Sequence, residues 1–194
     1  MTKISLGPKP YAVPTPLWII GTYDKDGKPD AMAAAWAGIA NSEPPCVFAA
    51  LRGSRKTYEN LLETRSFTVC IPPTSYAAEA DYFGIESGHD ADKFEKAGLT
   101  AEKANTVNAP YIREFPVHLE CRLFDRMTMG SHVIVIGRIE DVVADEAVLN
   151  ENGQPDIEKI DPVVFAPDIQ QYFGIGKNVG KAFRIGKEIK KTDE

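Results

Sequence analysis

Hydrophobic and polar residues alternate along much of this 194-residue chain with the two-residue period of β-strands. The alternation is clearest in residues 115–126, where Val117, Leu119, Cys121 and Leu123 share one face. Other runs are almost continuously apolar, which predicts strands that are buried on both faces. The predicted strands are residues 17–23, 31–41, 46–51, 66–71, 115–126, 131–145 (a long strand or a strand pair) and 162–167.

Turn signals separate these strands at short intervals, and helical spacing is confined to short segments. Asp-Gly within residues 24–28 predicts a hairpin turn, and the two prolines of residues 43–45 force another turn. Helices are predicted at about residues 55–64, 76–84 and 90–98. Because the strands are mostly joined by hairpins, the pattern favours a mainly β fold, a closed antiparallel β-barrel with short helices, over a parallel α/β sheet.

The length suits a single domain spanning residues 1–194. Residues 1–16 contain four prolines and predict an extended N-terminal arm. Residues 150–194 begin with a Gly/Pro turn and form a C-terminal extension that we expect to cover the barrel.

Composition and charge narrow the function classes. Apolar residues make up 43% and charged residues 26%, as in ordinary globular proteins. The net charge of −6 and the pI near 5.2 argue against general binding to nucleic acid or to an anionic membrane. Any anion bound here must therefore be held by a local cluster of donors.

Three widely spaced cysteines, Cys46, Cys70 and Cys121, form no C-x-x-C motif and predict neither a disulfide framework nor a zinc site. The N-terminus lacks the apolar core of a signal peptide, and the longest nearly apolar run, residues 31–40, is too short to span a bilayer. We therefore expect a soluble, cytoplasmic protein with reduced cysteines.

Several other candidate sites have little support. His89 with Asp90 and Asp92 lacks a second histidine, so a surface loop is favoured over a metal site. Residues 174–180, GIGKNVG, do not have the spacing of the dinucleotide fingerprint. No G-x-S-x-G motif supports a hydrolase. His118 alternates outward from the apolar face of its strand and predicts an exposed residue or a contact between strands.

One short stretch concentrates candidate chemistry. Residues 52–58, RGSRKTY, place three cations and three hydroxyls directly before a predicted helix, for which Ser54 is a good N-cap. A helix N-terminus offers unpaired backbone N–H groups and the positive end of the helix dipole. With Arg, Ser and Thr side chains around it, such a turn can bind a phosphate. The alternative is an ordinary helix start with solvated Arg and Lys side chains.

The predicted strand over residues 31–41 is rich in small residues around one large aromatic. Ala34 and Ala35 offer a flat backbone surface for a planar ring, and Trp36 either stacks on such a ring or belongs to the core. Residues 42–51 join this surface to the cationic turn. The distance suits one phosphorylated heteroaromatic ligand, although these residues do not identify it.

The order of these motifs resembles the flavin reductase-like family of FMN-binding split barrels, and within it the flavoredoxin-type proteins. The resemblance covers roughly Pro14 to Val143 and implies a split β-barrel of the Greek-key type. Its segments are "DGKPDAMAAAWAGIANSEPP", "RGSRKTYENLLETRSFTVCIP", "DKFEKAGL", "FPVHLECRL" and "MGSHVIVIGRIEDV".

The resemblance implies an FMN whose phosphate meets the cationic turn and whose ring lies along the alanine-rich strand and the backbone around residues 70–71. Lys93 matches a second phosphate contact, and Phe165 and Tyr172 would cover the ring unless they only pack in the core. The implied cofactor contacts are Ala34, Ala35, Trp36, Arg52, Ser54, Arg55, Thr57, Cys70, Ile71, Lys93 and Phe165.

Two positions depart from the family pattern. His132 follows Ser131 where the family carries an acidic residue, so His132 is expected to contact the electron donor or the flavin rather than to act as an acid or base. Cys70 stands where an asparagine is usual, so the contact expected there is made by the backbone.

The resemblance also implies a homodimer with the flavin near the subunit interface and a C-terminal extension able to cover the flavin. Electrons would pass from NAD(P)H or a redox protein through FMN to an acceptor. Three functions stay open: an NAD(P)H-dependent flavin reductase, a non-catalytic FMN electron carrier, and a dimeric binding module without a cofactor.

Overall fold

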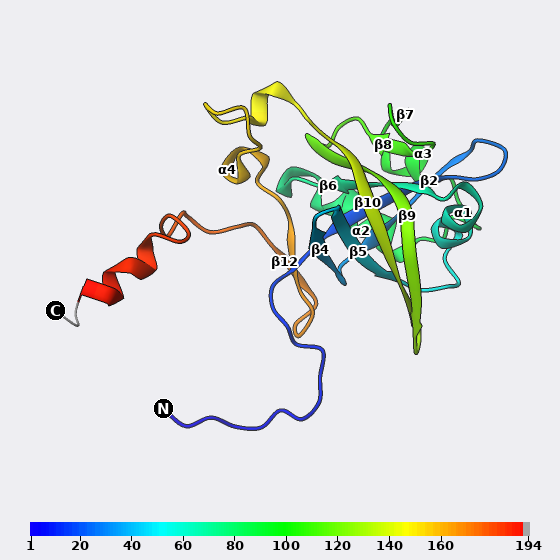
Figure 1. Ribbon diagram of the computed structural model, residues 1–194. Coiled ribbons are helices and arrows are strands. Elements are labelled where there is room, and N and C mark those ends of the chain that lie inside the picture. The colour runs from blue at the N-terminus through cyan, green and yellow to red at the C-terminus, as the bar shows by residue number, and fades with distance from the viewer. Residues whose placement is uncertain (192–194) are drawn as a thin grey trace.

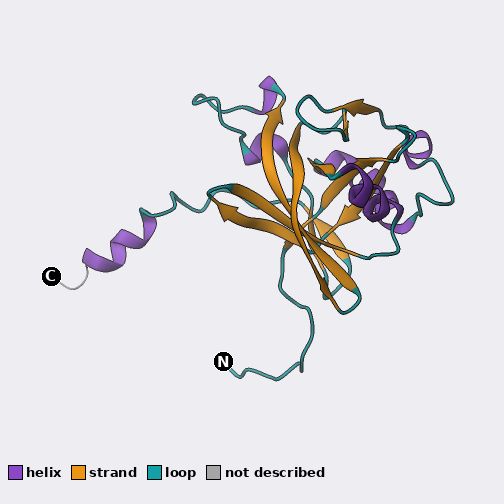
Figure 2. Cartoon of the chain, turned by 45° about the vertical axis from the view of Figure 1, so that its right-hand side comes forward, coloured by secondary structure: helices purple, strands orange, loops and turns teal. Residues whose placement is uncertain are grey.

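The computed structural model describes residues 1–191. The fold is mainly β with short helices, as the sequence predicted, and its body is a curled antiparallel sheet (Figures 1 and 2). Seven strands follow one another across this sheet in the order β3-β2-β6-β9-β10-β5-β4. Their bounds are β2 Trp18–Tyr23, β3 Pro29–Ala34, β4 Ala37–Ser42, β5 Pro45–Leu51, β6 Ser66–Ile71, β9 Val117–Met129 and β10 His132–Ala144.

The prediction of one strand over residues 31–41 is wrong. The chain bends at Ala35 and Trp36, so β3 pairs with β2 while β4 pairs with β5, at opposite edges of the sheet. The backbone N–H of Ala50 donates to the carbonyl oxygen of Trp36 at 2.8 Å. Trp36 thus continues the β4–β5 ladder directly after β3 ends at Ala34, so residues 35–36 join the two edges and the sheet curls into a barrel.

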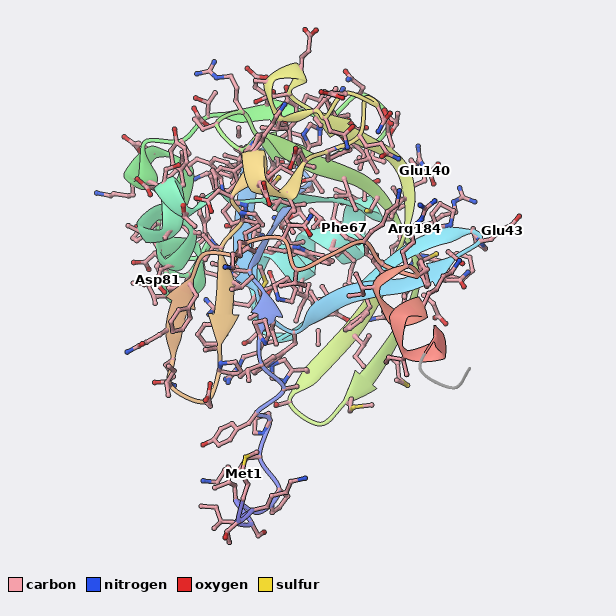
Figure 3. The ribbon with its side chains drawn as sticks, turned by 90° about the vertical axis from the view of Figure 1, so that its left-hand side faces the viewer. Met1, Glu43, Phe67, Asp81, Glu140 and Arg184 are labelled. Carbon is pink, nitrogen blue, oxygen red and sulfur yellow. The ribbon has the colours of Figure 1, made fainter. Side chains whose placement is uncertain are left out.

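Strands β2, β3 and β6 are buried on both faces, which explains their high apolar content. Alternate residues such as Ile20 face the barrel interior, where Phe67 lies near the centre of the molecule (Figure 3). Their neighbours, such as Ile19, pack outside the barrel with Phe83 and Phe94 from the helices that cover this face. The helical elements between β5 and β9 are α1 Lys56–Thr64, the 3₁₀ turn η1 Thr74–Tyr76, α2 Ala77–Ile85 and α3 Lys93–Ala97.

Two small sheets and the terminal segments complete the chain. The terminal segments, residues 1–14 and 174–191, run away from the barrel on the same side in Figure 1. The remaining elements are β1 Thr15–Pro16, β11 Val164–Ala166 and β12 Gln171–Phe173 in one sheet, β7 Ala101–Lys103 and β8 Pro110–Ile112 in another, η2 Glu146–Val148, α4 Ile157–Ile160 and η3 Ile185–Lys191.

His118 lies on the outer face of β9, as predicted, and contacts strand β8, but it is buried rather than exposed. Strands β9 and β10 form one long hairpin, but the loop around residues 104–109 covers the outer face of β9. The His118 ring stacks on Tyr111 with centroids 4.0 Å apart, and its Nε2 lies 3.6 Å from a carboxylate oxygen of the buried Glu120. Burial lowers the pKa of His118, and the Glu120 charge opposes this shift in part.

Candidate phosphate-binding turn and ring-binding surface

Strand register brings three of the predicted site residues to one end of the sheet. Val133 of β10 pairs with Leu51 of β5, which places His132 next to Arg52 at the ends of these strands. The bond between Ala50 and Trp36 brings Trp36 to the same region. The imidazole Nδ1 of His132 lies 2.9 Å from the hydroxyl of Ser131, within the tip of the hairpin.

The start of α1 leaves donors free at the surface. The helix begins at Lys56 with Arg55 as its N-cap, and no side chain caps it, so the expectation that Ser54 caps this helix is wrong. Arg52 and Ser54 are exposed, and their side chains have no hydrogen-bond or ion-pair partner among the residues that the structure describes. We call Arg52 and Ser54 the exposed pair.

Arg55 is half-buried and is bound within the protein. Its guanidinium donates to the carbonyl oxygens of Gly84 at 2.6 Å and Glu86 at 3.2 Å. These carbonyls belong to the C-terminal end of α2, where a cation also complements the helix dipole. Arg55 therefore joins the start of α1 to the end of α2.

Beneath the turn lies a buried ionic cluster, which we call the buried trio: Asp30, Thr57 and Lys93. The ammonium of Lys93 lies 3.0 Å from one carboxylate oxygen of Asp30, and the Thr57 hydroxyl donates to the other at 2.5 Å. Thr57 is completely buried and Lys93 almost so. Gly88 lies against this carboxylate so closely that a Cβ there would clash with it. The trio thus ties together β3, α1, α3 and the segment after α2.

Burial shifts the pKa of one member of the trio. Desolvation lowers the pKa of Lys93, and the charge of Asp30 and its hydrogen bond oppose this shift. The sequence predicted direct phosphate contacts for Arg55, Thr57 and Lys93. The structure gives all three of them partners inside the protein, whereas the exposed pair has none among the described residues. Contact of each of these residues with a phosphate stays a prediction.

The predicted ring-binding residues also come together, although mostly through their backbones. Trp18 pairs with Ala34 and Ile19 with Cys70, which places Ile71 beside Trp18. The side chain of Ala34 faces the barrel interior, and that of Cys70 is completely buried outside it. Burial raises the pKa of the Cys70 thiol to about 11, so the thiol is protonated at neutral pH.

An apolar cleft of about 400 Å³ begins next to this surface. Trp18 and Ile71 form one wall, and the N-terminal arm and the C-terminal extension form the rest. We call it the arm cleft; it is lined by Pro14, Thr15, Pro16, Leu17, Trp18, Ile71, Pro155, Ile157, Ile160, Pro162, Val163, Val164 and Ile175.

Phe165 lies in the small three-stranded sheet, where it pairs with Thr15. Its ring packs on that of Tyr172, with centroids 5.4 Å apart. The Tyr172 hydroxyl donates to a carboxylate oxygen of Asp81 on α2 at 2.7 Å, so this sheet is fastened to the helices that cover β3. Contact between Phe165 and a flavin ring stays a prediction.

Two residues that sequence reasoning missed shape the turn. Asp30 is the shared partner of the buried trio, and only its place beside the alanine-rich strand could have drawn attention to it. Arg126 of β9 donates to the Tyr58 hydroxyl of α1 at 2.7 Å. This bond spans 68 residues of sequence, and no local pattern signals it.

Among the described residues there is no group of three or more histidine, cysteine or acidic side chains arranged to hold a metal ion. None of the described helices is long and apolar enough to cross a membrane.

Comparison with known proteins agrees with this geometry. The family model of the flavin reductase like domain matches residues 11–168. The chain belongs to the flavin reductase-like family. The match includes the exposed pair, the buried trio and residues 34–36 and 70–71 of the predicted ring surface.

Solved structures from this family share the fold over nearly the whole chain. Flavoredoxin of Desulfovibrio vulgaris (Miyazaki F) is 45% identical and superposes with a TM-score of 0.92, covering 95% of this chain and all of that one. Flavoredoxin from Methanosarcina acetivorans is 29% identical with a TM-score of 0.90, covering 97% and 100% of the two chains. An uncharacterized protein of Aquifex aeolicus is 28% identical over 166 residues, 83% of each chain. These matches agree with the predicted split-barrel fold.

Proposed function

We propose that this protein binds FMN and transfers electrons in the manner of a flavoredoxin. The observation that carries the proposal is the exposed pair at an uncapped helix start, next to the backbone surface at Ala35 and Trp36. The similarity to flavoredoxin of Desulfovibrio vulgaris over 95% of the chain supports it.

The donors present fit a phosphate group. The N–H groups at the start of α1 have no side-chain cap, so an anion there would gain donors that the protein leaves free. Arg52 adds a positive charge and Ser54 a hydroxyl. We assign the direct phosphate contacts to the exposed pair, and we assign Arg55 and the buried trio the role of holding the turn in place.

A bound FMN would supply the redox chemistry, exchanging a hydride or single electrons with its partners. The polypeptide would orient the ring against the backbone of residues 34–36 and 70–71 and exclude water from it. Backbone N–H groups near Ile71 would stabilise the negative charge that develops on reduction. His132, next to Arg52, would contact the donor or the cofactor.

NAD(P)H-dependent flavin reduction is the second candidate function. Family membership favours it, because the matching family model is that of flavin reductases. A carrier would instead take its electrons from a redox protein, and the net charge of −6 suits docking to a basic partner. The two functions differ in whether a pyridine nucleotide reduces the bound flavin.

A homodimer with the flavin near the interface is part of this proposal. Ile39 on β4 and Phe124, Met127 and Met129 on β9 are large apolar side chains that the single chain leaves exposed. Apolar surface of this kind commonly marks a protein interface.

An absorbance spectrum followed by anaerobic titration tests the proposal. We expect a yellow protein that releases FMN on denaturation, or an apoprotein that takes up added FMN stoichiometrically. Bleaching by NADH or NADPH would assign the reductase function, whereas bleaching only by a reduced redox protein would assign the carrier. A colourless protein that fails to bind FMN would overturn the flavin proposal and favour a binding module without a cofactor.

A further inference from the structure

The two terminal segments expose apolar side chains to a degree unusual for a folded chain. In residues 1–13 these are Met1, Ile4, Leu6, Tyr11 and Val13, and in residues 174–187 they include Val179 and Phe183, whose exposed fractions are 86% and 95%. Figure 3 shows Met1 on a segment that projects from the body, and Figure 1 shows the C-terminal segment leaving it as well. Residues 175–180 only border a shallow pocket beside Asp156, Ile157 and Glu158 of their own chain, and the exposed side chains beyond them suggest a partner surface.

Charge separates these segments from the rest of the chain. Residues 1–16 carry two lysines and no acidic residue, and residues 174–187 carry four basic residues and no acidic one. The body between them, residues 17–173, has 14 basic and 25 acidic residues. The segments are therefore complementary in charge to a body of their own kind.

The arm cleft offers an apolar surface of matching character. Its lining is almost entirely apolar, and the hydroxyl of Thr15 already donates to the Phe165 carbonyl oxygen. Acidic residues Asp156 and Glu158 flank Ile157, which lines the cleft. An apolar segment that also carries lysines would pack its apolar side chains in the cleft and pair its lysines with these acidic residues.

We propose that two copies of this chain exchange their terminal segments, with Val179 and Phe183 of each copy packing in the arm cleft of the other. The C-terminal segment leaves the body at Ile175, which itself lines the cleft. In a two-fold dimer whose clefts face each other, each segment lies against the other copy's cleft at once. The chain from Ile175 to Phe183 can extend roughly 27 Å, enough to cross such an interface.

This inference rests on the proposed homodimer but not on flavin binding. It states which surfaces of the two copies meet. The exposed apolar side chains of β4 and β9 alone do not identify those surfaces. It also gives the cleft beside Trp18 and Ile71 a second subunit as one of its walls.

Cross-linking between two differently tagged versions of the full-length chain tests the exchange. One version carries Phe183→Cys and the other Ile157→Cys, an exposed position that lines the cleft. The three native cysteines are buried and do not compete. After co-expression and mild oxidation we expect a covalent dimer that carries both tags. The matched control pairs Phe183→Cys with Lys25→Cys, which lies in the β2–β3 turn far from both segments (Figure 1).

Absence of the doubly tagged covalent dimer, or equal cross-linking to the Lys25→Cys control, would overturn the exchange. Placing both cysteines in one chain separates a further case. If that double variant gives only an internal disulfide and no covalent dimer, the segment folds onto its own cleft and the inference is wrong.

Light scattering on the otherwise unmodified chain separates the inference from the homodimer itself. We expect Phe183→Asp to raise the dimer dissociation constant at least tenfold, with Phe183→Leu close to the original protein. A dimer indifferent to Phe183→Asp retains the homodimer and overturns the exchange. A protein that is monomeric at all concentrations overturns both, including one that instead sediments with phosphatidylserine vesicles.

Discussion

The exposed pair and the buried trio meet at the start of α1 and have opposite surroundings. Arg52 and Ser54 face solvent without a protein partner, whereas Thr57 and Lys93 converge on Asp30 beneath them. In sequence Arg52, Ser54, Thr57 and Lys93 look alike as phosphate ligands. The difference teaches that donors available to a ligand are those the fold leaves without a partner, while donors of the same type can serve to hold the site together.

Energetics explain why the two groups divide in this way. A buried ammonium is stable only when a counter-charge and hydrogen bonds compensate for its lost hydration. Lys93 has that compensation from Asp30 and so has little to gain from a ligand. Solvated Arg52 has no such partner, so a phosphate can recruit it at low cost.

The largest expected effect separates the two groups by stability. Asp30→Ala removes the counter-charge of Lys93 and the acceptor of the Thr57 hydroxyl, and it should lower the free energy of unfolding by about 3–5 kcal/mol. Denaturant unfolding of the protein without cofactor measures this loss. Adding Lys93→Met as a second substitution should recover part of it. A loss below about 1 kcal/mol would show that the trio does not hold the turn together.

The exposed pair should show the reverse behaviour. Arg52→Ala combined with Ser54→Ala should weaken FMN binding by about 2–4 kcal/mol, because a charge-assisted and a neutral hydrogen bond are lost. The unfolding free energy should change by no more than about 0.5 kcal/mol, as at other exposed positions. Fluorescence titration with FMN measures affinity, and Lys96→Ala on the surface of α3 is the matched control. Unchanged affinity would place the phosphate elsewhere.

Arg55 lies between the two groups, and its substitution should affect both properties. Arg55→Ala removes two hydrogen bonds to the end of α2, which should lower the unfolding free energy by about 1–2 kcal/mol. FMN affinity should fall as well, because the helix start loses its anchor. Arg55→Lys keeps the charge but not both bonds. Relative to the original protein, it should therefore lose less FMN affinity than unfolding free energy. An Arg55→Ala protein with normal stability would assign Arg55 to the ligand instead.

The smallest effect concerns a buried ionisable group away from the turn. Burial holds the pKa of His118 below its usual value of 6.5, so the unfolded chain binds a proton below that pH that the folded protein does not. Stability should therefore fall as the pH drops from 6.5 toward the folded pKa, by at most about 1.4 kcal/mol per pH unit. His118→Phe should remove this part of the slope in unfolding measurements at pH 7.5 to 5. FMN affinity should be unaffected, and an equal slope in the variant would contradict the assignment.

Much of the architecture was predictable because the spacing of hydrophobic residues along a strand or helix reflects which face is buried. Alternation located the strands and the short helices, and motif order gave the split barrel. The bend at Ala35 was not predictable, because a run of alanines suits a strand and a crossing equally well. His118 was predicted on the correct face but its burial was not, because alternation cannot reveal that a distant loop covers the second face of a strand. Asp30 was missed for a related reason: its partners are 27 and 63 residues away in sequence.

The bend at residues 35–36 also constrains how the protein folds. The β2–β3 and β4–β5 hairpins are neighbours in sequence, yet they form opposite edges of the sheet and meet only when β6, β9 and β10 have filled the space between them. Their closure depends on pairings between segments about 90 residues apart, such as Val133 with Leu51, and such non-local pairings slow folding. Closure of the barrel therefore comes late, whereas the bond between Ala50 and Trp36 belongs to the local β4–β5 hairpin. The surface proposed for the flavin ring is then among the last parts of the native structure to appear.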